Sequence, residues 1–153
     1  MCCGVTAVVA LRDTNLNVVQ TVMRLLSNIV NRGDESVGIG TIGLPGKPNH
    51  HWKDVGTAAK HFNNPETVAE IMKEFPGSRP IAIGHVRYAT ASRRDKDNAQ
   101  PHHFGTGGQR FVVASNGDIP FCNDLIQQLT QNCKYQFESD CDAEVIAKLI
   151  GNE

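Results

Sequence analysis

The chain has neither a long apolar run nor an excess of one charge, and each absence removes a class of partner. Its longest apolar run, Val5 to Leu11, is far too short to cross a bilayer. No basic leader or small-residue cleavage pattern accompanies that run, so we expect no signal peptide. The 15 lysines and arginines nearly balance the 16 aspartates and glutamates, and basic and aromatic residues do not alternate. We therefore expect neither a membrane nor a nucleic acid as partner.

Cysteine and histidine spacing also lacks the usual signatures of cross-links and metals. The five cysteines are an odd number, and none forms a C-x-x-C pair, so neither a disulfide framework nor a zinc ribbon is indicated. The loop histidines fit no i, i+4 pair on a helix. They are His50, His51, His61, His102 and His103. We expect a cytoplasmic protein with reduced thiols, no metal and no cofactor.

The 153 residues fit one domain in which helices cover a sheet. Short valine-rich or alternating runs predict strands, and apolar residues at helical spacing predict helices. The expected strands are 4–11, 37–41, 80–86 and 110–115. The expected helices are 16–30, 65–75, a third around 125–129 and a fourth that opens at 139–142 and runs to 150. Residues 44–49 and 91–109 are expected to be loops, because they are rich in proline, glycine and polar residues.

The amino terminus, Met1-Cys2-Cys3-Gly4-Val5, contains a candidate nucleophile. A cysteine that becomes the first residue after trimming carries a thiol and a free α-amine. That amine has a pKa of about 7.7–8.0, so part of it is unprotonated at neutral pH and can accept the thiol proton. The alternative is that these cysteines have no chemical role.

Arg87 and Thr90 follow the expected strand 80–86 and could bind an anionic group. A guanidinium can hold a carboxylate with two parallel hydrogen bonds, and Thr90 offers a hydroxyl and a backbone amide beside it. The alternative is an ordinary surface arginine at the end of a strand.

Two segments of the second half could complete a site. The Asn116 amide and the Gly117 backbone N–H would make a pair of donors for a developing oxyanion, although Asn-Gly is also a common tight turn. Asp142 begins a helix within Ser139-x-x-Asp142. It could cap that helix or pair with a substrate ammonium.

Taken in order, these segments resemble the glutaminase domain of class II glutamine amidotransferases, which are N-terminal-nucleophile hydrolases. Order and approximate spacing hold over nearly the whole chain. The matching stretches are Cys3-Gly4-Val5, Asn31 to Ile39, Gly84 to Thr90, Asn98 to Pro101, Ser115 to Ile119 and Asp142 to Ile146. Within the class, His85 to Tyr88 and Ala99 to Pro101 are most similar to the amidophosphoribosyltransferases of purine synthesis. The tail from Tyr135 to Ile150 is equally similar to the glucosamine-6-phosphate synthase branch.

The resemblance implies an α+β fold, the four-layer αββα sandwich, and hydrolysis of the glutamine side-chain amide through a cysteinyl thioester. The ammonia would pass to a synthase or phosphoribosyltransferase domain or chain. The implied roles are the nucleophile for Cys3 or Cys2, carboxylate binding for Arg87 with Thr90 beside it, ammonium binding for Asp142, the oxyanion hole for Asn116 and Gly117, and the pocket wall for Arg32 and Gly33.

The sequence departs from the family pattern at three places. Removal of Met1 alone would expose Cys2, whereas alignment of the motif favours Cys3, so both stay candidates. The usual histidine before Asn-Gly is Ser115, and the following asparagine is Asp118.

The third departure concerns length, because the chain stops at Glu153 where the family fold continues. We therefore expect residues 1–153 to form a glutaminase domain that is incomplete at its C-terminus and has no synthase or transferase domain. An exposed apolar sheet face would then favour an oligomer or a partner chain. The alternative function is a catalytically inactive, truncated or degenerate domain that acts through protein interaction.

Overall fold

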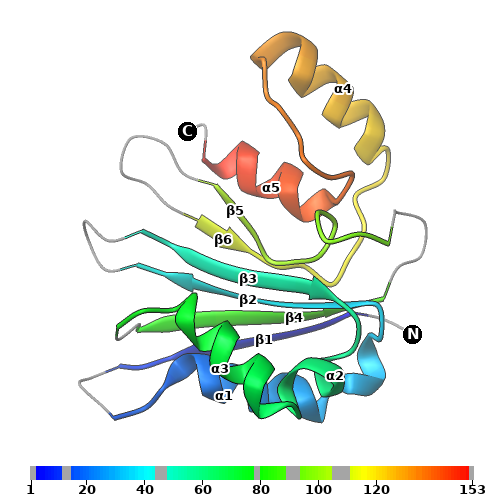
Figure 1. Ribbon diagram of the computed structural model, residues 1–153. Coiled ribbons are helices and arrows are strands. Elements are labelled where there is room, and N and C mark those ends of the chain that lie inside the picture. The colour runs from blue at the N-terminus through cyan, green and yellow to red at the C-terminus, as the bar shows by residue number, and fades with distance from the viewer. Residues whose placement is uncertain are drawn as a thin grey trace.

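The computed structural model describes residues 3–11, 15–43, 48–77, 80–88, 94–104 and 111–151 (Figure 1). In chain order the elements are β1 (Gly4–Val9), α1 (Val18–Asn28), the 3-10 helix η1 (Val30–Arg32), β2 (Ser36–Ile42), β3 (His50–Val55), α2 (Ala58–Phe62), α3 (Pro65–Lys73), β4 (Ile81–Arg87), β5 (His102–Phe104), β6 (Phe111–Val113), α4 (Cys122–Cys133) and α5 (Asp142–Ile150).

The described strands form two antiparallel sheets. The larger sheet has the order β1-β4-β2-β3, so the first strand pairs with one that is far away in sequence. Its register places Val5 opposite His85, and Ser36 opposite Arg87. The smaller sheet is the pair β5-β6.

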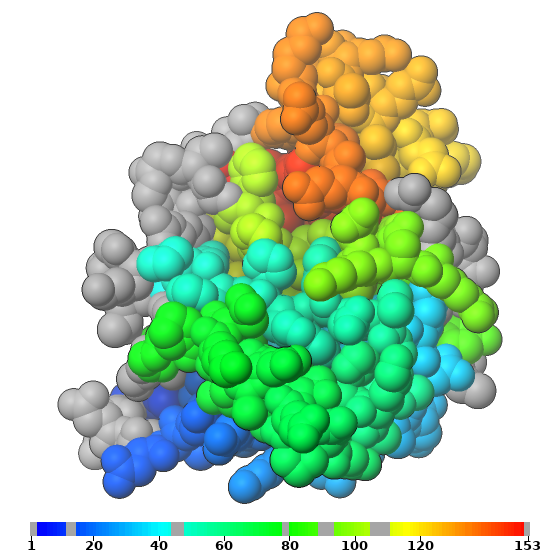
Figure 2. Space-filling view, in the orientation of Figure 1, coloured from blue at the N-terminus to red at the C-terminus, as the bar shows by residue number. Residues whose placement is uncertain are grey.

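These elements stack in four layers (Figure 1). Helix α1 packs on β1 and β4, while α5 packs on β5 and β6. The two sheets meet where β6 approaches β2. The order helix, sheet, sheet, helix is the αββα sandwich, so the predicted α+β fold class is confirmed. Helix α4 packs against α5 and projects from one end of the molecule (Figures 1 and 2).

The main core lies between the larger sheet and the helices α1, α2 and α3. One face of α1 is apolar and buried, with Val22 and Leu26 fully enclosed. These side chains pack over β4 beside Gly84, where a Cβ atom would lie 2.8 Å from the Leu26 Cδ1 atom. At the helix start, the Asn17 side chain accepts a hydrogen bond from the Gln20 N–H at 3.1 Å and satisfies one free amide.

The opposite face of β1 is more open. Thr6 and Val8 point toward the helices, whereas Val5 and Val9 are 43% and 52% exposed. Because side chains alternate along a strand, these two valines lie on the face of the larger sheet opposite the helices. An apolar strip of the larger sheet is thus open to solvent.

The structure corrects several expected elements. The residues 91–109, expected to be a loop, contain β5, and β3 and α2 were not predicted. The expected helix 16–30 is α1 followed by η1, and Gly33 follows η1 in an extended conformation. Helix α3 has the predicted start, with Asn64 Oδ1 accepting the Glu66 and Thr67 amides. Among the helices described here, none has the length and apolar character needed to span a membrane.

The packing of α1 predicts the stability of two neighbouring variants. We expect Leu26→Ala to lower the free energy of unfolding by about 2–5 kcal/mol, because it leaves a cavity against β4. The matched change Leu25→Ala, at a side chain 39% exposed on the same helix, should cost under about 1 kcal/mol. Urea unfolding of both variants measures the difference. Equal losses would contradict this placement of the core.

Candidate active site

The pairing of β1 with β4 places the Cys3 thiol beside Arg87. Gly4 pairs with Val86, so Cys3, the residue before β1, lies next to Arg87, the last residue of β4. The Cys3 Sγ atom accepts a hydrogen bond from the Tyr88 N–H at 3.4 Å and lies 3.7 Å from the Tyr88 carbonyl oxygen. A candidate nucleophile and a candidate anion-binding residue therefore lie close together at one end of the β1–β4 strand pair.

Arg87 is held by Glu35 and by the close approach of Gly33. Its Nη1 donates to the Glu35 Oε1 at 2.7 Å, and both side chains are buried. The Glu35 backbone N–H donates to the Arg87 carbonyl at 3.1 Å. A Cβ atom at Gly33 would lie 2.5 Å from the Arg87 carbonyl group, so only glycine fits here. Gly33 thus packs directly against the backbone of Arg87.

The other wall of the site comes from the start of α5. Asp142 is the first residue of this helix, and the N-cap residue is Cys141. The Cys141 thiol donates to the Asp142 Oδ1 atom at 3.8 Å, and burial raises the pKa of Cys141 to about 11. This thiol therefore stays protonated at neutral pH.

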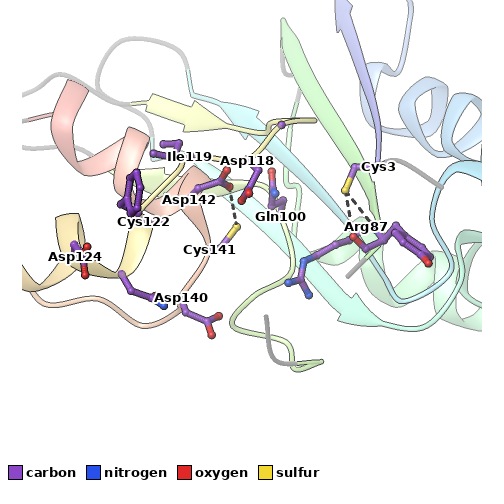
Figure 3. Close-up of a pocket in the computed structure, with 14 residues that line it drawn as sticks. Cys3, Arg87, Gln100, Asp118, Ile119, Cys122, Asp124, Asp140, Cys141 and Asp142 are labelled. Carbon is purple, nitrogen blue, oxygen red and sulfur yellow. Dashed lines mark hydrogen bonds between the residues drawn. The ribbon is translucent and has the colours of Figure 1, made fainter. Parts of the chain in front are cut away.

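These walls enclose a cavity of about 450 Å³ (Figure 3). Cys3 and Arg87 come from the β1–β4 side, Cys141 and Asp142 from the opposite side, and Gln100 lies between them. A thiol, a cation and an anion thus face one space. Such a space suits a small molecule that carries both a carboxylate and an ammonium group.

Known proteins with this fold were found by sequence and by structure. The amidophosphoribosyltransferase of Methanocaldococcus jannaschii is 31% identical over 99% of this chain. A glutamine–fructose-6-phosphate aminotransferase of Streptococcus pneumoniae is 31% identical over 97%. The chain is therefore homologous to the glutamine amidotransferases. No family model matches it.

Solved structures agree with this homology. A structure described as the allosteric regulatory enzyme of purine biosynthesis superposes with a TM-score of 0.74 at 29% identity over 99% of this chain. The glutamine phosphoribosylpyrophosphate amidotransferase of B. subtilis gives 0.69 at 28% identity over 99%. The chain spans about 30% of the length of the Methanocaldococcus jannaschii relative and of both solved structures, and 22% of the aminotransferase.

The structure brings some of the predicted site residues of this chain together and leaves others apart. Cys3, Arg87, Gly117 and Asp142 all line the cavity. Asn116 is exposed and is not part of the lining.

Arg32 and Gly33 are the predicted pocket wall, but neither lines the cavity. Arg32 is exposed in η1 and does not line the cavity, whereas Gly33 is buried behind Arg87. Cys2 and Thr90, also predicted to belong to the site, lie outside the described residues. Their roles stay predictions.

Asp142 begins α5, as predicted, but no side chain caps the helix, and the segment before it is held by Ser139 and Glu144. Ser139 does not cap the helix directly, since its hydroxyl accepts the Cys141 N–H at 3.2 Å and donates to Glu144 Oε2 at 2.6 Å. The Glu144 carboxylate also accepts hydrogen bonds from the backbone amides of Glu138 and Ser139. It forms an ion pair with Lys148 at 3.0 Å. Sequence reasoning missed this buried carboxylate, whose one signal was an acidic residue in the first turn of a helix.

The described residues contain no group of three or more histidine, cysteine or carboxylate side chains that could hold a metal ion. The His51 and His103 rings lie 4.1 Å apart at their centroids, and burial lowers the pKa of His51 to about 4. These rings pack as neutral groups.

The Glu144 contacts predict a pH-dependent loss of stability. Burial disfavours ionisation of Glu144, but hydrogen bonds from Ser139, Glu138 and Lys148 outweigh it and hold its pKa below the usual value. The carboxylate therefore stabilises the fold above the unfolded-state pKa of about 4.3, and this contribution is lost as pH falls through the lower folded-state pKa.

We expect Glu144→Gln to cost about 1–3 kcal/mol at pH 7. The difference in free energy of unfolding between this variant and the wild type should become smaller below about pH 4. Urea unfolding of both proteins across this pH range measures it. Glu66→Gln, at an exposed residue of α3, is the control and should show neither effect. A Glu144→Gln loss that is independent of pH would contradict the assignment.

Proposed function

We propose that this chain hydrolyses the side-chain amide of glutamine through a cysteinyl thioester and supplies the ammonia to a synthase or phosphoribosyltransferase partner. The observation that carries the proposal is the placement of Cys3, Arg87 and Asp142 around one cavity. The homology to glutamine amidotransferases supports the same reaction class.

The charges of the cavity match the backbone groups of an amino acid. Arg87 would bind the α-carboxylate and Asp142 the α-ammonium of glutamine. A guanidinium has five N–H donors, so it can contact Glu35 and a substrate carboxylate together. Thr90 is assigned beside the carboxylate on the family resemblance.

The reaction would begin with transfer of the Cys3 thiol proton to a free α-amine. The thiolate would attack the amide carbon, and the resulting oxyanion would be stabilised by Gly117, which lines the cavity, and by Asn116. The role of Asn116 rests on the family resemblance, since its exposed side chain is not part of the lining. The C–N bond then breaks, the nitrogen takes up a proton, and ammonia departs. A thioester between the cysteine and the substrate remains. Water hydrolyses the thioester to glutamate and restores the thiol.

The amine base requires that the nucleophilic cysteine become the first residue. The position of Cys3 in the cavity favours it as the nucleophile, which requires removal of both Met1 and Cys2. If only Met1 is removed, Cys2 carries the amine instead. The intact mass of the protein distinguishes these two termini.

We favour a phosphoribosyl acceptor of the purine-synthesis type for the ammonia. The names of several relatives and of both solved structures support this choice. Residues 1–153 would form the glutaminase domain and act with a separate acceptor domain or chain. The exposed Val5 and Val9 of β1 offer an apolar surface for such a partner or for an oligomer.

Active-site labelling tests the nucleophile. A diazoketone analogue of glutamine should alkylate Cys3 or Cys2, and millimolar glutamine should prevent the labelling, because both compounds would occupy the same cavity. Peptide mass spectrometry identifies the modified residue. The internal controls are Cys122, Cys133 and Cys141, and unprotected labelling spread over these three would contradict the proposal.

Substitution of Arg87 tests substrate binding. We expect Arg87→Lys to raise KM for glutamine roughly 10-fold to 100-fold, because an ammonium keeps the charge but loses the bidentate geometry. Ammonia release by the purified chain measures it, with Arg24→Lys on the exposed side of α1 as the control. A folded wild-type chain that releases no ammonia would instead favour the inactive, interaction-only domain.

A further inference from the structure

The segment that carries Asn116 and Gly117 is held by two buried side chains that the proposed reaction does not use. The Ser115 N–H donates to Gln100 Oε1 at 2.7 Å. The Ser115 carbonyl lies 3.1 Å from His85 Nε2. Gln100 is 4% exposed, and His85 is completely buried. Both backbone groups of one residue are therefore bound by side chains from distant parts of the chain.

His85 can act here only as a neutral donor. A carbonyl oxygen accepts hydrogen bonds, so the proton of the ring must reside on Nε2. Burial lowers the pKa of His85 to about 4, the hydrogen bond to Ser115 opposes this shift, and the charge of Arg87 adds to it. The ring is thus neutral at physiological pH. Its Nδ1 atom is buried and has no hydrogen-bond partner among the described residues.

The position of Gln100 is fixed by the larger sheet. Gly38 of β2 pairs with His85 of β4, and a side chain at Gly38 would collide with the Gln100 carbonyl oxygen. The backbone at Gln100 therefore packs directly on β2, beside the ring of His85. Gln100 also lines the cavity, between the Cys3 side and the Asp142 side (Figure 3).

We propose that His85 and Gln100 are positioning residues that hold the Ser115 backbone and thereby set where the Asn116–Gly117 donors stand relative to Cys3. This inference rests on the proposed glutaminase function. Oxyanion donors act only from well-defined positions, and β6 ends at Val113, two residues before Ser115. Beyond that strand end, the two side chains supply the order that a sheet would otherwise provide.

The same arrangement explains why the side chain at position 115 can vary. Both contacts use backbone atoms of Ser115, and its hydroxyl is buried without a partner among the described residues. The departure from the family histidine at this position therefore leaves the two contacts intact. The Gln100 and His85 side chains, by contrast, cannot be exchanged for apolar groups without losing a hydrogen bond.

Two pairs of variants of the full chain test the proposal. Gln100→Met removes the acceptor while keeping the side-chain length, whereas Gln100→Glu keeps an oxygen at that place. His85→Phe removes the donor, whereas His85→Gln keeps an amide N–H near the position of Nε2. We expect Gln100→Met and His85→Phe to lower kcat for glutamine hydrolysis roughly 10-fold to 100-fold, with KM within about 3-fold. The conservative variants should recover most of the loss.

A second measurement tests the hydrogen bond of the Ser115 amide directly. Hydrogen exchange at the Ser115 amide should be slow in the wild type and about 10-fold or more faster in Gln100→Met, because its hydrogen bond is gone. Ile71→Ala serves as the control, since it removes a buried side chain of α3 that does not line the cavity. It should destabilise the protein but leave both kcat and the exchange ratio of Ser115 to its neighbours unchanged.

The outcomes separate the two proposals. A wild-type chain without glutaminase activity would overturn the proposed function, and the exchange rates would still decide whether Gln100 holds Ser115. An active wild type whose folded Gln100→Met variant keeps its kcat, or keeps slow exchange at Ser115, would overturn this inference and leave the function standing. A rise in KM with constant kcat would also overturn it, because that pattern indicates a binding contact and no effect on the oxyanion donors.

Discussion

The antiparallel pairing of β1 with β4 is the constraint on which the site depends, because it joins two segments whose paired residues are 72 to 82 positions apart in the sequence. Its register leaves the Cys3 thiol in contact with the backbone of Tyr88, one residue beyond Arg87. A slip by one residue would turn every side chain of β1 to the other face of the sheet. Thr6 and Val8 are half-buried on the helix side of the sheet, and Val8 packs against the core, which opposes such a slip. The packing of the core therefore also sets the geometry of the site.

The Arg87–Glu35 pair shows how the same sheet orients a charge. Both partners are buried, and removing one partner of such a pair is costly because it leaves an uncompensated charge. The pair is therefore weak evidence for stability and stronger evidence for a fixed orientation. Its position at the cavity means that a bound carboxylate would meet a guanidinium whose direction is already set.

Periodicity was enough to predict the longer elements with a clear apolar pattern, and it failed for elements that are short or do not alternate. α1, α3, β2 and β4 bury one face or most of their length, so their patterns are clear. Strand β3 is half-buried along nearly all its length and shows no alternation. Helix α2 and strand β5 have only five and three residues, too few for a period to be read.

The residue types that suit an amino-acid substrate, and their order along the chain, follow from the sequence, because a thiol, a guanidinium and a carboxylate have the same chemistry in any fold. Only the tertiary structure decided which of them share a space. It brought Cys3, Arg87 and Asp142 to one cavity, left Arg32 in solvent, and added Glu35, Glu144 and the two side chains that hold Ser115. Such contacts join residues far apart in the chain, and their partners are selected by strand register and packing, which no local pattern records.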